Sequence, residues 1–245
     1  MKVKHLVGAF LCVLGCYACS SPKTEVQSPD GHIKMTLTVD ENGKPFYNVS
    51  VDDSLLIENS AMGFTVANGI ILAEGFQVKN TTFSSEDETW TQPWGENKKN
   101  RNHYNEMAVS LTNEDQVQLT LRFRVFDDGI GFRYEYTVPT VDSLLITDEL
   151  TTFHFHRDGT SWSIPASAET YELLYQQQPI SEVETANTPF TFKTADGVYG
   201  SIHEAALYDF PEMTLKQIGH YTLKAELAPW PDGIKARKGN HFTTS

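Results

Sequence analysis

The chain has 245 residues, 40% of them hydrophobic and 11% aromatic, and a formal net charge of −13. This apolar content supports a packed core and excludes a disordered chain. The acidic charge disfavours nucleic acid and anionic lipid as partners, and it permits a neutral oligosaccharide without indicating one. The length suits one or two domains, and a β-sandwich can use all of it as one.

The N-terminal segment predicts export. Lys2 and Lys4 precede the apolar run 6–14, which is too short to span a bilayer as a helix. Small residues then stand before Cys16 and Cys19. This order is typical of a signal peptide, here residues 1–18.

The cysteine positions resemble the lipobox of bacterial lipoproteins, in which the cysteine is lipidated and becomes the mature N-terminus. Cys19 is favoured because the polar residues 20–22 follow it directly, and Cys16 is the alternative; an ordinary cleaved signal without lipid also fits. All three cysteines lie in this segment, so no disulfide framework is expected in the body. Residues 19–27 are expected to be a tether and 28–245 one domain, placed in the periplasm or cell envelope.

Alternation of apolar and polar residues begins at residue 33. It runs through 33–39, and the turn signal Asn42-Gly43 leads to a partner run over 47–51. The same period of two predicts strands over residues 107–111, 117–125, 130–138 and 221–227. The pattern predicts an all-β chain folded as a large antiparallel β-sandwich.

Three segments depart from the alternation. The best short helix candidate is 168–175. Residues 84–105 mix polar and aromatic side chains and are interpreted as a recognition loop. Residues 235–242 are basic and polar, with no clear terminal strand.

Four sequence motifs occur in a characteristic order. They are 87–106 (with Asp-Glu-Thr-Trp, Gln-Pro-Trp-Gly-Glu and Arg-Asn-His-Tyr-Asn-Glu), 126–134, 162–175 and 202–207. Together they resemble the N-terminal domain of glycoside hydrolase family 97, from about Ser28 to the last residue. That family contains bacterial α-glucosidases and α-galactosidases.

The resemblance implies a β-super-sandwich similar to galactose mutarotases, placed before a (β/α)₈ barrel that carries the catalytic carboxylates. No barrel follows in these 245 residues, so we expect this chain to be inactive alone and assign it no catalytic residue. In an intact enzyme the partners would be the barrel and an α-linked oligosaccharide, and contact with the membrane would be only through a lipid anchor.

The resemblance also implies a calcium site to which the N-terminal domain lends one glutamate, here Glu172. Calcium takes six to eight oxygen ligands, so the missing barrel would have to supply the rest. Tight calcium binding by this chain alone is therefore not expected. The alternative is that Glu172 is one of several solvated acids, such as Glu169 and Glu182.

Two further groups of residues are candidates for a functional role. His203 and Glu204 are adjacent, and on a strand they would point to opposite faces and share no substrate. Trp90, Trp94, His103 and Tyr104 either stack on sugar rings or pack the segment against the sheet or barrel, and Arg101 with Glu96 is a candidate ion pair within it.

Three hypotheses follow. The chain is an accessory domain of a family 97-like glycosidase, which predicts an exposed apolar docking patch. Alternatively it is a free-standing carbohydrate-binding lipoprotein, which needs a groove with aromatic and polar groups. The third is a mutarotase-like epimerase, which needs a histidine and a carboxylate in one pocket.

Overall fold

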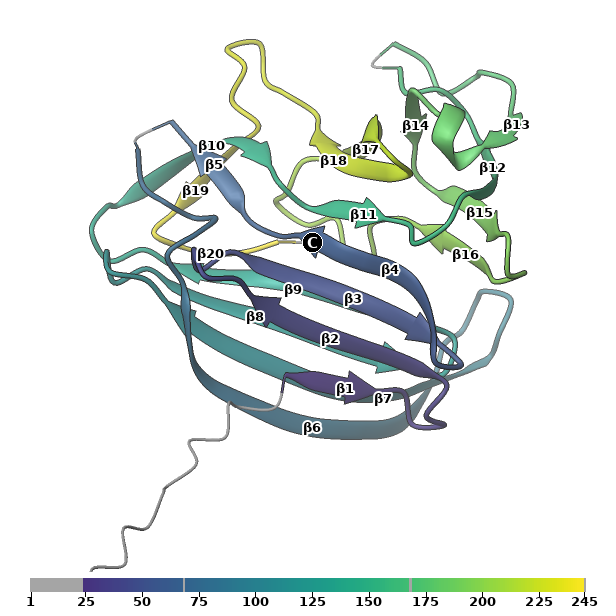
Figure 1. The fold of residues 1–245 in the computed structure, drawn as a ribbon, viewed down its shortest axis with the longest axis horizontal. Coiled ribbons are helices and arrows are strands. Elements are labelled where there is room, and N and C mark those ends of the chain that lie inside the picture. The colour runs from purple at the N-terminus through teal and green to yellow at the C-terminus, as the bar shows by residue number, and fades with distance from the viewer. Residues whose placement is uncertain (1–23, 68, 168, 245) are drawn as a thin grey trace, which may run out of the picture.

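The computed structural model describes residues 24–67, 69–167 and 169–244, and they form an all-β super-sandwich (Figure 1). One main sheet is an antiparallel meander of four strands: β1 (Glu25–Gln27), β2 (Ile33–Val39), β3 (Pro45–Val51) and β4 (Ser54–Ala61). The facing sheet has the order β20 (His241–Thr243), β9 (Gly129–Thr137), β8 (Gln118–Phe126), β7 (Lys99–Thr112) and β6 (Gln77–Thr91). The predicted sandwich is thereby confirmed.

Three smaller sheets complete the fold. The first extends the β4 layer in the order β11 (Thr152–His154), β18 (Thr222–Leu227), β17 (Met213–Gly219) and β14 (Thr185–Asn187). The second has the order β13 (Gln176–Pro179), β12 (Gly159–Ser163), β15 (Phe190–Thr194) and β16 (Tyr199–Ile202). The third joins β19 (Ala236–Gly239), β10 (Ser143–Glu149) and β5 (Phe64–Val66), and a short 3₁₀ turn covers Ile180–Glu182.

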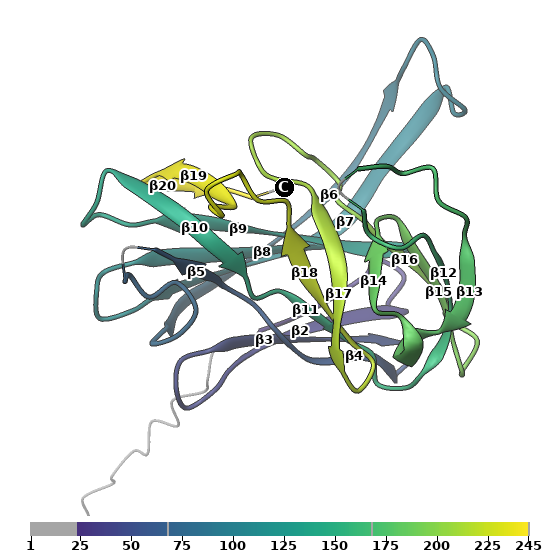
Figure 2. The same ribbon diagram turned by 90° about the horizontal axis from the view of Figure 1, so that it is seen from above.

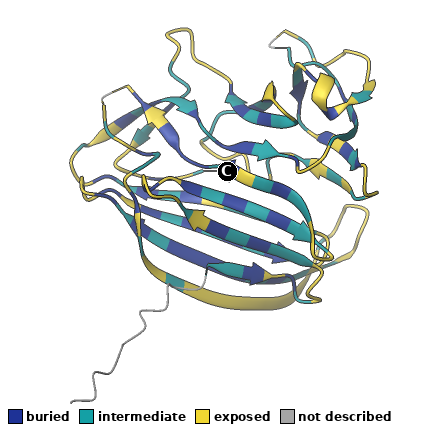
Figure 3. Cartoon of the chain, viewed as in Figure 1, coloured by how far each residue is buried: buried dark blue, intermediate teal, exposed yellow. Residues whose placement is uncertain are grey.

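The core lies between the two main sheets because their alternating apolar side chains face each other (Figure 3). On β8, every second residue from Leu119 to Val125 is buried, which matches the alternation in the sequence. Buried tyrosines find partners for their hydroxyl groups: Tyr47 donates to the Thr152 carbonyl at 2.8 Å and Tyr136 to the Leu72 carbonyl at 2.6 Å. Burial without such a partner would cost about 1–3 kcal/mol.

The segment interpreted as a recognition loop is instead a long hairpin, so that prediction is wrong. Strands β6 and β7 pair continuously from Ser84↔Glu106 to Thr91↔Lys99. Figure 2 shows the far half of this hairpin projecting beyond the rest of the fold. Most of β6 is exposed, so neither face needs apolar residues and the period of two that marks a half-buried strand is missing.

Other differences from the sequence-based predictions are local. Residues 169–175 form no helix but an irregular loop, and the last basic segment does form two short strands, β19 and β20. Residues 25–27, placed in the tether, pair with β2 as strand β1. None of the helices found in residues 24–67, 69–167 and 169–244 is long and apolar enough to cross a membrane.

The turn between β2 and β3 requires a glycine at position 43, and this requirement can be tested. Gly43 has φ +75°, and a Cβ at this position would overlap the backbone of Gly75 and Phe76. Gly43→Ala should therefore destabilise the fold by about 2 kcal/mol or more in urea unfolding, because strain and overlap add. Gly31→Ala is the matched control: φ is +82° there but nothing lies within 4 Å. Equal losses for the two variants would contradict the overlap.

Candidate functional site

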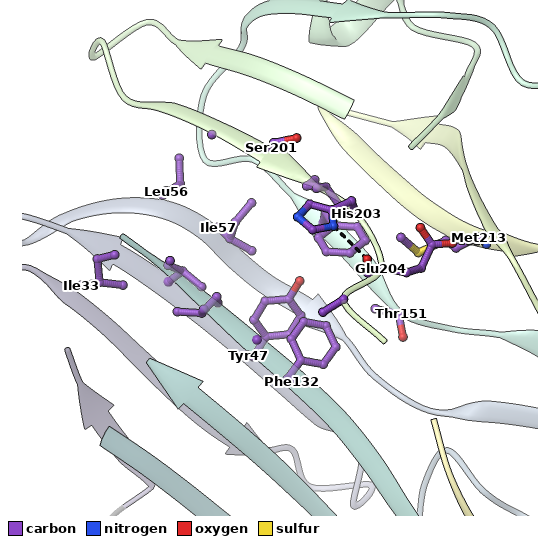
Figure 4. A pocket seen from close by; sticks show the side chains of 18 of the residues that line it. Ile33, Tyr47, Leu56, Ile57, Phe132, Thr151, Ser201, His203, Glu204 and Met213 are labelled. Carbon is purple, nitrogen blue, oxygen red and sulfur yellow. Dashed lines mark hydrogen bonds between the residues drawn. The ribbon is translucent and has the colours of Figure 1, made fainter. Parts of the chain in front are cut away.

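A cavity of about 680 Å³ opens where the two main layers part (Figure 4). Its walls come from β2, β3 and β4 on one side, from β9 on the other, and from the segment after β16. The lining is mainly aliphatic and aromatic, and includes Ile33, Val49, Leu56, Ile57, Ile130, Phe132, Phe153, Ile202, Phe210 and Met213. Such walls suit an apolar occupant better than a sugar, which needs many polar partners.

A buried carboxyl group contributes to the lining of this cavity. Glu149 is 7% exposed, and its Oε1 accepts a hydrogen bond from Thr151 Oγ1 at 2.6 Å. Tyr134 in turn donates to Thr151 at 2.6 Å, and the Gly63 N–H donates to Tyr134 at 3.3 Å. Burial raises the pKa of Glu149 to about 7, against the opposing effects of Thr151 and Lys224. Glu149 therefore titrates near neutral pH, where it holds a proton part of the time.

His203 and Glu204 also line the cavity, but they follow β16 instead of lying on it. His203 Nδ1 is 2.8 Å from the Glu204 carbonyl oxygen, and because a carbonyl oxygen only accepts, Nδ1 donates this hydrogen bond. The Glu204 carboxylate accepts hydrogen bonds from Thr188 Oγ1 at 2.7 Å and from the Met213 N–H. Glu204 is thus engaged in holding its own segment.

The structure places Glu172 on the exposed loop 169–175, where its backbone N–H donates to Thr170 Oγ1 at 3.0 Å. Among the residues described, no group of three or more His, Cys, Asp or Glu side chains is placed to hold a metal ion. Glu172 offers at most one carboxylate to a calcium ion that takes six to eight oxygen atoms. The described residues do not form a complete calcium site, and the assignment of Glu172 stays a prediction.

Three loops carry a concentration of exposed large apolar side chains. The loops are 169–175, 205–212 and 228–235, and we call them the docking loops. Tyr171 donates a hydrogen bond to Glu212, and the Ala228 N–H donates to the Glu212 carbonyl at 3.0 Å, so the three are tied together. Their exposed members are Tyr171, Leu173, Leu174, Tyr175, Leu207, Tyr208 and Trp230.

The aromatic residues of the hairpin separate into two groups. Trp90 and Trp94 are exposed on the projecting arm, Trp94 to 84%. Tyr104 is buried, with its ring 5.2 Å from that of Phe126. Burial of Tyr104 favours packing for this residue, whereas Trp90 and Trp94 remain available for a partner.

Other candidate residues of this region are placed as follows. Arg101 pairs with Asp87, with two contacts of 2.7 Å, instead of with Glu96. His103 Nδ1 lies 3.7 Å from Asp127 Oδ2. Cys16 and Cys19 lie outside the described residues.

Comparison with known proteins decides the family. The family model described as Glycosyl-hydrolase 97 N-terminal matches residues 26–244. The chain belongs to this family. It is 25% identical over 246 residues to a retaining alpha-galactosidase of Bacteroides thetaiotaomicron, covering 94% of this chain and 36% of that protein. This glycoside hydrolase 97 N-terminal domain thus spans about a third of the relative it matches.

Solved structures agree with the assignment. A glycoside hydrolase family 97 enzyme of Pseudoalteromonas sp. strain K8, solved with acarbose and as a variant with panose, superposes with a TM-score of 0.86 at 37% identity. The match covers 90% of this chain and 34% of that enzyme. A beta-arabinopyranosidase at 19% identity and TM-score 0.78 shares the fold.

Glu149 was not found from the sequence, and the reason is a change of phase in β10. Leu144 and Ile146 are buried, so strict alternation would turn Asp148 inward. The register between β10 and β5 shifts between Ile146 and Asp148, and Glu149 faces the interior instead. A bulge depends on pairing with a distant strand, so the local pattern gives no signal for it.

The raised pKa of Glu149 predicts a pH-dependent stability. The folded protein retains a proton that the unfolded chain releases at its ordinary pKa of 4.5, so stability should fall as pH rises from about 4.5 to about 7. The loss should be on the order of 3 kcal/mol. Glu149→Gln, which mimics the protonated acid, should remove this slope in urea unfolding. The control Glu169→Gln, on the exposed loop, should keep it. A slope unchanged in Glu149→Gln would contradict the assignment.

Proposed function

We propose that this glycoside hydrolase 97 N-terminal domain is the accessory, carbohydrate-binding part of a calcium-dependent, exo-acting α-glycosidase of the α-glucosidase or α-galactosidase type. In that role it supports the active site of a (β/α)₈ barrel carried by the rest of the enzyme. The α-linked oligosaccharide would be bound by the intact enzyme, at the junction between the domain and the barrel.

The observation that carries the proposal is the apolar surface of the docking loops. Leu174 is 88% exposed and Tyr208 82%, and both lie on loops tied through Glu212. Large apolar patches on soluble proteins mark interaction sites. The relatives are about three times as long as this chain, so they contain a further domain that can cover such a surface. Glu172 lies within the same loops, which is where a ligand shared with the barrel belongs.

The two alternatives receive less support. The cavity does contain a histidine and carboxyl groups, as an epimerase requires, but the Glu204 carboxylate is occupied by Thr188 and Met213 and the walls are mainly apolar. A free-standing carbohydrate-binding lipoprotein needs a groove with convergent aromatic and polar groups. The exposed Trp90 and Trp94 lie instead on the hairpin arm. Export to the periplasm or cell envelope with a lipid on Cys19, or on Cys16, remains part of the proposal.

The docking role is tested by substitution on the loops. Leu174→Ser combined with Tyr208→Ser should change the melting temperature of this chain by less than about 2 °C, because both side chains are already solvated. The same pair should weaken association with the separately produced catalytic part of the enzyme at least about tenfold, measured by calorimetry. Ile218→Ser, at a residue 55% exposed outside these loops, is the control. Unchanged affinity in the double variant would contradict docking through this surface.

The calcium role is tested in the intact enzyme. Glu172→Gln removes one charged ligand and should raise the calcium concentration for half-maximal activity on maltose or an α-galactoside at least about tenfold. Glu169→Gln, three residues away on the same loop, should leave it unchanged. For this chain alone, chelation should shift the melting temperature by less than about 1 °C. A calcium requirement that is identical in both variants would remove Glu172 from the site.

A further inference from the structure

Strand β9 has one edge that is only partly paired. Strand β8 covers its inner edge along its whole length, from Phe126↔Gly129 to Gln118↔Thr137. On the other edge, β20 pairs only with Glu135–Thr137. Thr244 adds backbone contacts to Tyr134, with Thr244 N–H donating to the Tyr134 carbonyl at 3.1 Å. Within the described part of the chain, no strand lies beside Gly129–Phe132 on this edge.

This unpaired half of β9 is also a wall of the cavity. Residues 129–132 line it, as do Tyr134 and Thr244. The backbone groups of Ile130 and Phe132 have the same parity as Tyr134, so they point to the open edge. Buried or half-buried backbone N–H and C=O groups are nearly always paired in native proteins. A single strand could therefore complete both features, because it supplies backbone hydrogen bonds to the edge and apolar side chains to the cavity.

We propose that this site takes an extended polypeptide strand that continues the line of β20, antiparallel to β9, and fills the cavity. The occupant is a segment of the same enzyme outside residues 26–244, which the family model matches. The inference therefore rests on the proposed function, in which this domain is part of a longer enzyme. The mode is β-strand addition, in which main-chain bonds bind the strand and alternate side chains enter pockets. A small apolar molecule would fill the space but would leave the edge unpaired.

The observed register fixes which side chains of the strand point inward. His241 pairs with Thr137, Phe242 with Tyr136 and Thr243 with Glu135. Phe242 is buried and Thr244 lines the cavity, whereas Thr243 is exposed. Continuing this alternation, the first and third residues after position 245 face the cavity, opposite Phe132 and Ile130. They should be apolar, and the residues between them polar.

The test adds four residues to the C-terminus of the 245-residue chain. The in-register extension is Val-Thr-Val-Thr, and the matched control Thr-Val-Thr-Val has the same composition but turns its valines outward. Amide exchange is followed by NMR. The in-register extension should slow exchange at Ile130 and Phe132 at least about tenfold relative to the unextended chain and raise the melting temperature by several degrees. The control should do neither.

Three results would overturn the proposal. One is amide protection at Ile130 and Phe132 already present in the unextended chain, which would mean the edge is paired. Another is equal behaviour of the two extensions. The third is a small molecule retained by the purified chain and seen as added mass in native mass spectrometry, which would assign the cavity to a ligand. Neither extension contains a barrel and the test needs no catalytic part of the enzyme, so its outcome is separate from that of the docking test, although Phe210 and Pro211 of docking loop 205–212 line the cavity.

Discussion

The whole domain depends on two apolar sheet faces packed against each other. Leu119 and Leu121 on β8 are completely buried, and Met35 and Leu37 on β2 are at most 1% exposed. These two strands contact each other across the layers. A slip of one residue in any of these strands would turn its apolar set outward. The packing therefore fixes the register of the main strands and holds the hairpin arm, the docking loops and the cavity in their relative positions.

The cavity is the place where this packing stops. Toward Gly129 the layers separate, and half-buried Ile130 and Phe132 line the space between them, with the Phe132 ring still 5.3 Å from that of Tyr47 on β3. The same region holds Glu149, whose desolvated carboxyl favours the protonated form. The lining is mainly apolar, although it also includes Asp127, His203 and Glu204. This mainly apolar lining fits the proposed structural completion better than catalysis.

The exposed large apolar side chains of the docking loops lie outside the cavity, although docking loop 205–212 also contributes Phe210 and Pro211 to its lining. The docking loops present Leu174, Tyr208 and Trp230, and they come from three distant parts of the chain that hydrogen bonds through Glu212 bring together. This arrangement is typical of α/β and β enzymes in which rigid sheets position loops for an interface. Under the proposed function this is the surface offered to the barrel, and Glu172 lies on one of its loops.

The sequence by itself determined the strands of the sandwich and the family to which the chain belongs. Runs such as 33–39 and 117–125 alternate because each strand has one buried face, and that period is visible locally. Only the tertiary structure decided the rest. The β10 bulge that turns Glu149 inward and the meeting of Tyr171 with Glu212 depend on contacts between distant segments. The hairpin arm around Trp90 is local, but its exposure on both faces depends on where the rest of the chain packs. Contacts between distant segments leave no periodic pattern in the sequence, because the residues of one segment do not specify which distant segment packs against it.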